Sequence, residues 1–375
     1  MRLTHFVFIT ILIAGFAVNA HAANNAQSEL IQDLMQKAEQ GDADAQFQLG
    51  DFFFSGQYTM PEIGKALTYY GEAAAQEHVA ALGRLGYIYL HGVNVQADEQ
   101  RAFEYLQRAD IQGDAASAFN LGYTVLTGGF VKQVTEDREA RGMRWIHDAA
   151  GDGYGPAQFT LGEAYLKGIV VDVNLPRALK LFNEALDNEI FDAGKLLGEQ
   201  YAQGTGVSQD IGKAIGYYAK ALELARAAQA GTRTLALFSF RLAELHELAS
   251  SPQLSEATRL YKEAAGHDIQ SIANLANIRL ARLAIAHGDV DRIKATQVKV
   301  FDAALVGSAP ATCLVIETLE KGGTGLHHDP EMAEQWTDKL NDELLSRQGL
   351  CPECSLKDDR EKVCSMTRAS STPLF

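Results

Sequence analysis

Three features are scarce in this chain: positive charge, long apolar runs and cysteine. Lys and Arg number 33 against 48 Asp and Glu, for a net charge of −15. Nucleic-acid phosphates need Lys and Arg to neutralise them, so this acidic balance argues against a nucleic-acid partner. After residue 22 no segment approaches the roughly 18 consecutive apolar residues of a membrane helix. We therefore expect no transmembrane segment in the mature chain.

Residues 1–22 are typical of a secretory signal peptide. Arg2 precedes an apolar run from Phe6 to Val18, and Ala20-His21-Ala22 has the form of a cleavage site. No cysteine lies near that site, so a bacterial lipoprotein anchor is not expected. We predict cleavage near Ala22 and a periplasmic or secreted location. Retention of the segment as an N-terminal anchor is the alternative.

Sequence motifs of catalysis are also missing. The chain contains no H-E-x-x-H, no G-x-S-x-G, no S-x-x-K and no G-x-x-x-x-G-K-[ST]. His327-His328-Asp329 resembles a metal cluster, but Asp329 is followed by Pro330 and fits the start of a helix. We expect no enzymatic activity, no metal site and no cofactor.

What the chain does contain is an internal repeat. A leucine-glycine pair recurs at intervals of 36, 36, 40 and 36 residues, and the longer step coincides with extra residues before Trp145. The five pairs are Leu49-Gly50, Leu85-Gly86, Leu121-Gly122, Leu161-Gly162 and Leu197-Gly198. Fainter copies follow at Leu242-Ala243 and Leu280-Ala281, and 323–336 repeats the second half of the unit.

The pattern within one unit predicts a helical hairpin. Ala157, Leu161, Gly162 and Tyr165 share one face of a helix, and a mid-helix glycine implies close packing of a second helix. Glycines such as Gly56, Gly168 and Gly204 are suited to ending the first helix in the left-handed conformation. Asp98 and Asp210 are candidate N-caps of the second helix. Hairpins of this kind must stack to bury their alanine-lined faces.

The unit resembles the Sel1-like repeat, a relative of the tetratricopeptide repeat. The segment "AGKLLGEQYAQGTGVSQDIGKAIGYYAKA" carries the signature at Leu197, Gly198, Tyr201, Gly204, Gly206, Val207, Asp210, Lys213 and Ala214. The resemblance covers residues 38–227 well and 228–347 loosely. It implies an all-α, right-handed superhelical solenoid of stacked helix-turn-helix hairpins. It also implies a scaffold or adaptor that binds another protein or peptide.

The repeat pattern divides the chain into five parts. They are a signal peptide at 1–22, an N-terminal capping helix at 23–40, five clear repeats at 41–227, degenerate repeats at 228–347 and a cysteine-containing tail at 348–375. From Leu222 to Leu248 the step between units stretches, which predicts longer helices there.

Two positions in each first helix form a candidate binding stripe: the residue before the leucine and the residue after the glycine. These are Gln48, Asp51, Arg84, Tyr87, Asn120, Tyr123, Thr160, Glu163 and Glu199. In related superhelices first helices line the concave groove, so we expect a partner to bind there. Tyr87 and Tyr123 stand out, because aromatic residues are common contact residues. Two alternatives stay open: a solvated helix face, and a groove that binds a cell-wall polymer or exopolysaccharide.

All four cysteines lie late in the chain, at Cys313, Cys351, Cys354 and Cys364. In an oxidising compartment they predict disulfides rather than a redox or zinc site. Four cysteines allow three pairings, and we expect Cys313 to pair with the tail. Such a bridge stabilises by about 3–4 kcal/mol in the chain-entropy model.

Overall fold

The computed structural model describes most of the chain between residues 29 and 339. The described ranges are 29–56, 60–135, 137–267, 269–287, 290–305, 308–321 and 331–339. Within them every regular element is a helix, beginning with one at 29–39. The predicted signal peptide and the tail that carries Cys351, Cys354 and Cys364 lie outside these ranges. The chain divides into two compact units, Met1–Asn188 (unit 1) and Glu189–Phe375 (unit 2).

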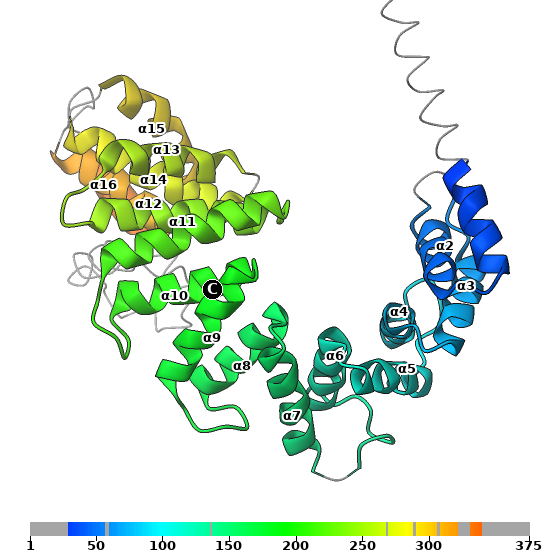
Figure 1. Cartoon of the computed structure of the whole chain (residues 1–375). Coiled ribbons are helices and arrows are strands. Elements are labelled where there is room, and N and C mark those ends of the chain that lie inside the picture. Colours follow the sequence, from blue (N-terminus) through cyan, green and yellow to red (C-terminus); the bar gives the residue numbers. More distant parts are fainter. Residues whose placement is uncertain are drawn as a thin grey trace, which may run out of the picture. The chain divides into compact units, whose positions relative to one another are not determined.

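Unit 1 is a stack of four helical hairpins (Figure 1). The first helices of the hairpins are α2, α4, α6 and α8, and each pairs with the second helix that follows it, α3, α5, α7 or α9. Their bounds are α2 Ala43–Ser55, α3 Ile63–Ala75, α4 Val79–His91, α5 Glu99–Ile111, α6 Ala115–Leu126, α7 Arg138–Gly151, α8 Gly155–Lys167 and α9 Leu175–Asp187. Each second helix also packs on the next first helix, and buried side chains form one cluster from α2 to α5 and another from α5 to α8.

The hairpins begin and end where the sequence predicts. Asp98 caps α5, because its carboxylate accepts a hydrogen bond from the Arg101 backbone N–H at 3.0 Å. Asp210 caps α11 in the same way. Gly56, Gly168 and Gly204 all adopt the left-handed conformation that ends a first helix. The predicted helix boundaries are therefore confirmed.

The glycine of the leucine-glycine pair marks the closest approach of the two helices. An added Cβ at Gly162 would lie 2.7 Å from the Phe182 ring, and one at Gly86 would lie 2.6 Å from Leu106. Each facing side chain lies 20 residues further along and is fully buried. A large side chain on the second helix thus packs directly against the glycine backbone, in space that a Cβ would otherwise occupy.

In the longer third repeat, one arginine side chain bonds the connector between α6 and α7. Arg138, at the start of α7, donates hydrogen bonds to the carbonyl oxygens of Phe130 (3.0 Å), Val134 (2.6 Å), Val125 (3.3 Å) and Gly129. These carbonyls belong to the end of α6 and to the connector, which contains the extra residues. One guanidinium therefore joins the end of α6 to the connector, in addition to the backbone N–H groups that bond the Val125 and Phe130 carbonyls.

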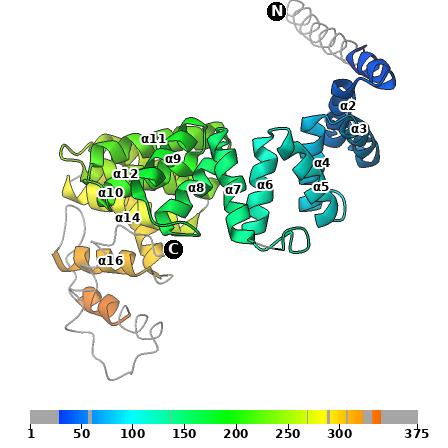
Figure 2. The ribbon, with the colours of Figure 1, turned by 60° about the horizontal axis from the view of Figure 1, so that its bottom comes forward.

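Unit 2 continues the hairpin pattern with longer helices. Its first helices are α10, α12, α14 and α16, and Figure 2 shows α10, α11 and α12 packed together. The bounds are α10 Phe191–Gln203, α11 Ile211–Ala227, α12 Thr232–Leu248, α13 Leu254–Gly266, α14 Gln270–Ala286, α15 Val290–Leu305 and α16 Ala309–Lys321. A further helix spans 331–339. With 17 residues each, α11 and α12 confirm the predicted lengthening.

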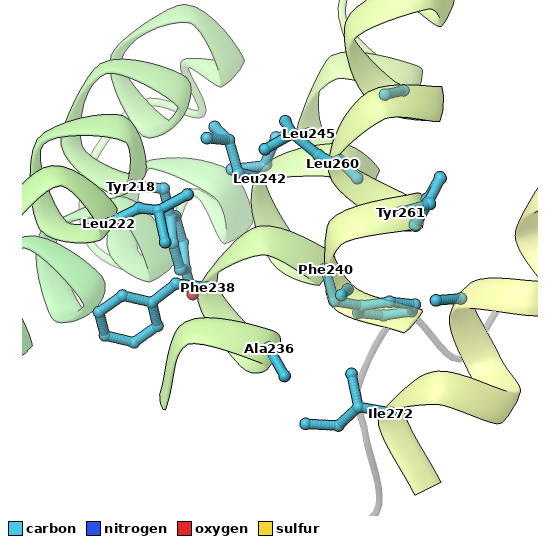
Figure 3. Close-up of a cluster of buried hydrophobic side chains, with 14 of the residues drawn as sticks. Tyr218, Leu222, Ala236, Phe238, Phe240, Leu242, Leu245, Leu260, Tyr261 and Ile272 are labelled. Carbon is cyan, nitrogen blue, oxygen red and sulfur yellow. The ribbon is translucent and has the colours of Figure 1, made fainter. Parts of the chain in front are cut away.

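The core of unit 2 is richer in aromatic side chains than an alanine-lined hairpin requires. Tyr218 of α11 meets Phe238 of α12 edge to face, with ring centroids 6.1 Å apart (Figure 3). Phe240 and Tyr261 make a similar contact at 5.5 Å. All four are buried. These rings fill the larger space between the longer helices.

First helices also contact one another along the stack. In unit 1 α4 contacts α6, and in unit 2 α12 contacts α14 and α14 contacts α16. Among the described helices, no two second helices make contacts as extensive. Within each unit the first helices of these hairpins are thus closer together than the second helices.

Candidate binding surface

The nine predicted stripe residues all lie on first helices, eight in unit 1 and Glu199 on α10 of unit 2. They are half-buried or exposed, while the leucine and glycine between them are buried. Tyr87 is 47% exposed and Tyr123 49% exposed. Leucine and glycine face the second helix, so the flanking positions are left facing outward.

The structure brings together stripe residues of the first two hairpins. Arg84 of α4 forms an ion pair with Asp51 of α2 at 3.3 Å. Asp51 also accepts a hydrogen bond of 2.6 Å from the hydroxyl of Tyr70, whose ring packs on Gly50. Burial raises the pKa of Tyr70, so the hydroxyl keeps its proton and remains a donor. The acid after the glycine is thereby fixed from two sides.

Tyr87 and Tyr123 are supported from within their own helices. The Tyr87 ring packs on His91 with centroids 4.4 Å apart, and Tyr123 stacks on Phe119 at 5.6 Å. Phe119 in turn contacts Tyr154 of the next hairpin at 5.5 Å. Each tyrosine therefore has one face held in place while about half of its surface is open to solvent.

The partners of the remaining acidic stripe residues, Glu199 and Glu163, differ with the aromatic residue on the second helix. Glu199 accepts a long hydrogen bond of 3.4 Å from the Tyr218 hydroxyl. In the fourth hairpin the equivalent ring is Phe182, which has no hydroxyl, and Glu163 pairs with Lys167 instead. Gln48, Asn120 and Thr160 complete the stripe as neutral polar side chains.

The stripe continues into α12, at positions that were not predicted from the sequence. Arg241 and Glu244 flank Leu242-Ala243 just as Arg84 and Tyr87 flank Leu85-Gly86. Glu244 is only 5% exposed and accepts hydrogen bonds from Arg241 at 2.8 Å and from Arg279 of α14 at 2.9 Å. Burial raises the pKa of Glu244, against the lowering effect of the two arginines. The faint copies at Leu242 and Leu280 carried the signal that locates these residues.

A cavity of about 490 Å³ lies beside this cluster in unit 2. Helices α10, α11 and α12 form its walls. Its lining combines charged and amide side chains with apolar ones: Glu199, Gln203, Gln209, Arg241 and Glu244, with Ala202, Ile211, Tyr218, Leu245 and Leu248.

The predicted disulfide cluster lies mostly outside the described residues. Cys313, on α16, is buried against Ile316 and Ala333. Cys351, Cys354 and Cys364 are not described, so the pairing stays a prediction. Within the described ranges no group of three or more His, Cys, Asp or Glu side chains is placed to hold a metal ion.

Comparison with known proteins identifies the repeat. The Sel1 repeat matches residues 43–78, 79–114, 115–153, 155–189 and 196–225. The chain is a Sel1-repeat protein. The matched segments coincide with the four hairpins of unit 1 and with α10 and α11 of unit 2.

Several curated proteins are related to this Sel1-repeat protein. Chitin synthase regulator SKT5 of Saccharomyces cerevisiae is 24% identical over 213 residues, which is 53% of this chain and 30% of that protein. An uncharacterised protein of Neisseria meningitidis is 28% identical over 165 residues, 44% of this chain and 33% of the relative. The chain spans about a third or less of the length of the curated relatives it matches.

Solved structures confirm the predicted fold. A protective antigen of uropathogenic Escherichia coli with an SLR fold superposes with a TM-score of 0.67 at 22% identity, over 90% of this chain and 70% of that one. A Sel1 repeat protein from Oxalobacter formigenes gives 0.51 at 22% identity, over 62% and 98%. The all-helical solenoid of Sel1-like hairpins is therefore confirmed. Among the described helices, none has the length and apolar character to cross a membrane.

Proposed function

We propose that this Sel1-repeat protein is a non-catalytic scaffold that binds a partner protein through the first-helix stripe of unit 1. The observation that carries the proposal is the pair Tyr87 and Tyr123. They occupy equivalent positions on two first helices that contact each other, and each is about half exposed with one face supported. Rigid, partly exposed aromatic rings supply contact area at little entropic cost, which suits them to anchor a partner.

Neighbouring polar groups support the same surface. The Asp51–Arg84 ion pair and the Asn120 amide provide hydrogen-bonding groups around the two rings, as a polar rim does around an apolar centre. Sel1 repeats are generally protein-interaction scaffolds without catalytic activity. Two fungal relatives are named as regulators of chitin synthase, and regulation by binding another protein is compatible with this role.

We also propose that the protein acts in the bacterial cell envelope after export. The support is the signal-peptide pattern at 1–22 and the late cysteines, which suit an oxidising compartment.

A pull-down from periplasmic extract tests the scaffold proposal. Residues 23–375 are used as bait in three forms: wild type, Tyr87→Ala/Tyr123→Ala, and the control Ile111→Ala/Ile169→Ala. The control removes two exposed side chains of unit 1, 77% and 52% exposed, that lie off the stripe. We expect a protein that the wild type and the control recover and the tyrosine variant loses.

Two results would contradict the proposal. One is recovery of the same proteins by all three forms. The other is co-sedimentation of the wild type with purified cell-wall material free of protein, with no protein enriched, which would favour the polymer-binding alternative.

A further inference from the structure

Three residues that line the cavity between α10, α11 and α12 have equivalents in the first hairpins of unit 1, but the arginine bonds differently in the two places. In unit 1, Asp51 is bonded to a buried tyrosine hydroxyl and paired with Arg84 of the next first helix. Glu199 occupies the position of Asp51, and its hydroxyl donor is Tyr218. The residue equivalent to Arg84 is Arg241, which precedes Leu242 on the next first helix.

Arg241 is held elsewhere, by its own helix. Its guanidinium donates to Glu244 at 2.8 Å, and Arg279 donates to the other oxygen of Glu244 at 2.9 Å. Arg279 also lies 3.9 Å from Glu247, which accepts a hydrogen bond from the Tyr261 hydroxyl. The two arginines and the two glutamates therefore balance one another in charge.

Glu199 is left outside this balanced cluster. In the part of the chain that the structure describes, its bonding partner is the Tyr218 hydroxyl, and no ion pair with a described cation neutralises it. Burial and the nearby Glu199 charge raise the pKa of Tyr218, so the hydroxyl stays a neutral donor. The cavity of about 490 Å³ lies beside Glu199, and Arg241, the equivalent of Arg84, lines it as well.

We infer that this cavity binds one arginine side chain of a partner protein, whose guanidinium pairs with Glu199 as Arg84 pairs with Asp51. The apolar lining residues Ile211, Leu245 and Leu248 contact the aliphatic part of the side chain. Gln203 and Gln209 supply amide oxygens for the remaining N–H groups. This inference rests on the proposed scaffold function and adds the chemistry of a second contact, in unit 2.

Charge favours a cation over an anion in this site. Arg241, a positive group of the lining, is already bonded to Glu244, whereas Glu199 has only a neutral donor. The net charge of −15 also favours a basic partner segment at longer range. Arginine fits better than a compact ammonium group, because its planar fork donates two parallel hydrogen bonds to one carboxylate.

Binding of short peptides to the whole mature chain tests the inference. The probe is an acetylated and amidated pentapeptide with one arginine among alanines. Its counterpart carries citrulline, which keeps the shape of arginine and removes the charge. We expect saturable binding of the arginine peptide by calorimetry or NMR titration, and binding weaker by about tenfold or more for the citrulline peptide.

Two variants locate the site. Glu199→Gln keeps an oxygen to accept from Tyr218 and removes the charge, so the fold is retained, as circular dichroism will verify. It should weaken binding of the arginine peptide by about tenfold. Glu223→Gln, an exposed acid on α11, is the matched control and should leave the affinity unchanged.

The inference is overturned if the wild type does not bind the arginine peptide, if citrulline binds equally well, or if Glu199→Gln has no effect. None of these results affects the unit 1 stripe, whose partner binding depends on Tyr87 and Tyr123. Recovery of the same proteins by all three bait forms, with intact arginine-peptide binding, would instead overturn the scaffold proposal alone.

Discussion

Gly50 shows that the packing of a hairpin can depend on the absence of one Cβ atom. It sits at the crossing of α2 and α3, where the Tyr70 ring covers its Cα and the Tyr70 hydroxyl reaches Asp51. The glycine thus serves both packing and the binding stripe, because it lets the tyrosine come close enough to hold the acid. Gly198, Tyr218 and Glu199 repeat this arrangement in unit 2.

Gly50→Ala should destabilise the protein by about 1–3 kcal/mol, as overpacking of a core does. A methyl group there would overlap the Tyr70 ring, whose Cγ would lie 3.0 Å away. Gly71→Ala, on α3 of the same hairpin, meets nothing within 4 Å and should instead stabilise by up to about 1 kcal/mol. Urea unfolding of the two variants compares them directly. Equal effects would mean that helix propensity, and not packing, decides both positions.

The half-buried Asp110 should make stability depend on pH with a sign opposite to that of the usual carboxylate. Burial is the main cause that raises its pKa above the ordinary 3.8, although the Trp145 indole donates to it at 3.0 Å. The folded state therefore holds this proton more tightly than the unfolded chain, and stability from this group is lost as the pH rises above 3.8.

Asp110→Asn should accordingly raise the free energy of unfolding at pH 7, because the amide oxygen still accepts from Trp145 and carries no charge. The advantage over the wild type should shrink as the pH falls toward 3.8, where the unfolded carboxyl is itself half protonated. Urea unfolding of both proteins across this pH range measures the difference. A difference that does not vary with pH would contradict the assigned shift.

The capping residues at the helix ends explain why the helix boundaries could be predicted from the sequence. Second helices α5, α9 and α11 each begin at an Asp or Asn whose side chain accepts from a backbone N–H three residues on. The glycine before each connector then allows the left-handed turn that ends the first helix. Local chemistry sets these boundaries. The start of α7 does not follow that rule, since Asp137 is left-handed and makes no side-chain cap.

Asp98→Ala should cost about 1 kcal/mol, because it removes the cap of α5 and leaves the Arg101 N–H without its acceptor. Glu62 stands at the equivalent place before α3 but makes no capping hydrogen bond. Glu62→Ala should therefore change stability by less than about 0.5 kcal/mol. Thermal unfolding of both variants separates the cap from a general loss of negative charge, which would affect them alike.

Arg138→Met should destabilise unit 1 by about 2 kcal/mol, since the carbonyls of Val134 and Gly129 lose the arginine donor and those of Phe130 and Val125 keep only their backbone donors. Arg144→Met removes an exposed arginine of the same helix, so it should leave the stability nearly unchanged. Hydrogen exchange at the α6–α7 connector provides the measurement. Protection that survives Arg138→Met would show that the connector folds without the arginine.

At the scale of the whole molecule, the repeat pattern predicted the hairpins but not the contents of unit 2. The leucine-glycine spacing located every first helix up to α10, because those helices depend on one close contact that only glycine permits. In α12 an alanine, Ala243, stands at the position of the glycine, and Phe238 and Phe240 are buried in the core on the same helix. The cavity lies between three helices, and the Arg241–Glu244–Arg279 cluster joins α12 to α14, so neither could be predicted from one segment of sequence.

The stripe shows the same division. Its positions follow from helical spacing alone, and the structure places all nine as predicted on first helices. Which of them contact each other could not be derived from spacing. The Asp51–Arg84 pair depends on how α2 and α4 pack together, whereas Glu163 pairs with Lys167, which lies outside the stripe and four residues further along α8.

The affinity of the recovered partner is the most direct test of the scaffold account. The purified partner is titrated against the wild type, Tyr87→Ala/Tyr123→Ala and the Ile111→Ala/Ile169→Ala control. Removing two anchoring aromatic residues should raise Kd by about tenfold or more and leave the control within about twofold of the wild type. Equal Kd values for all three proteins would show that the first-helix stripe of unit 1 is not the binding surface.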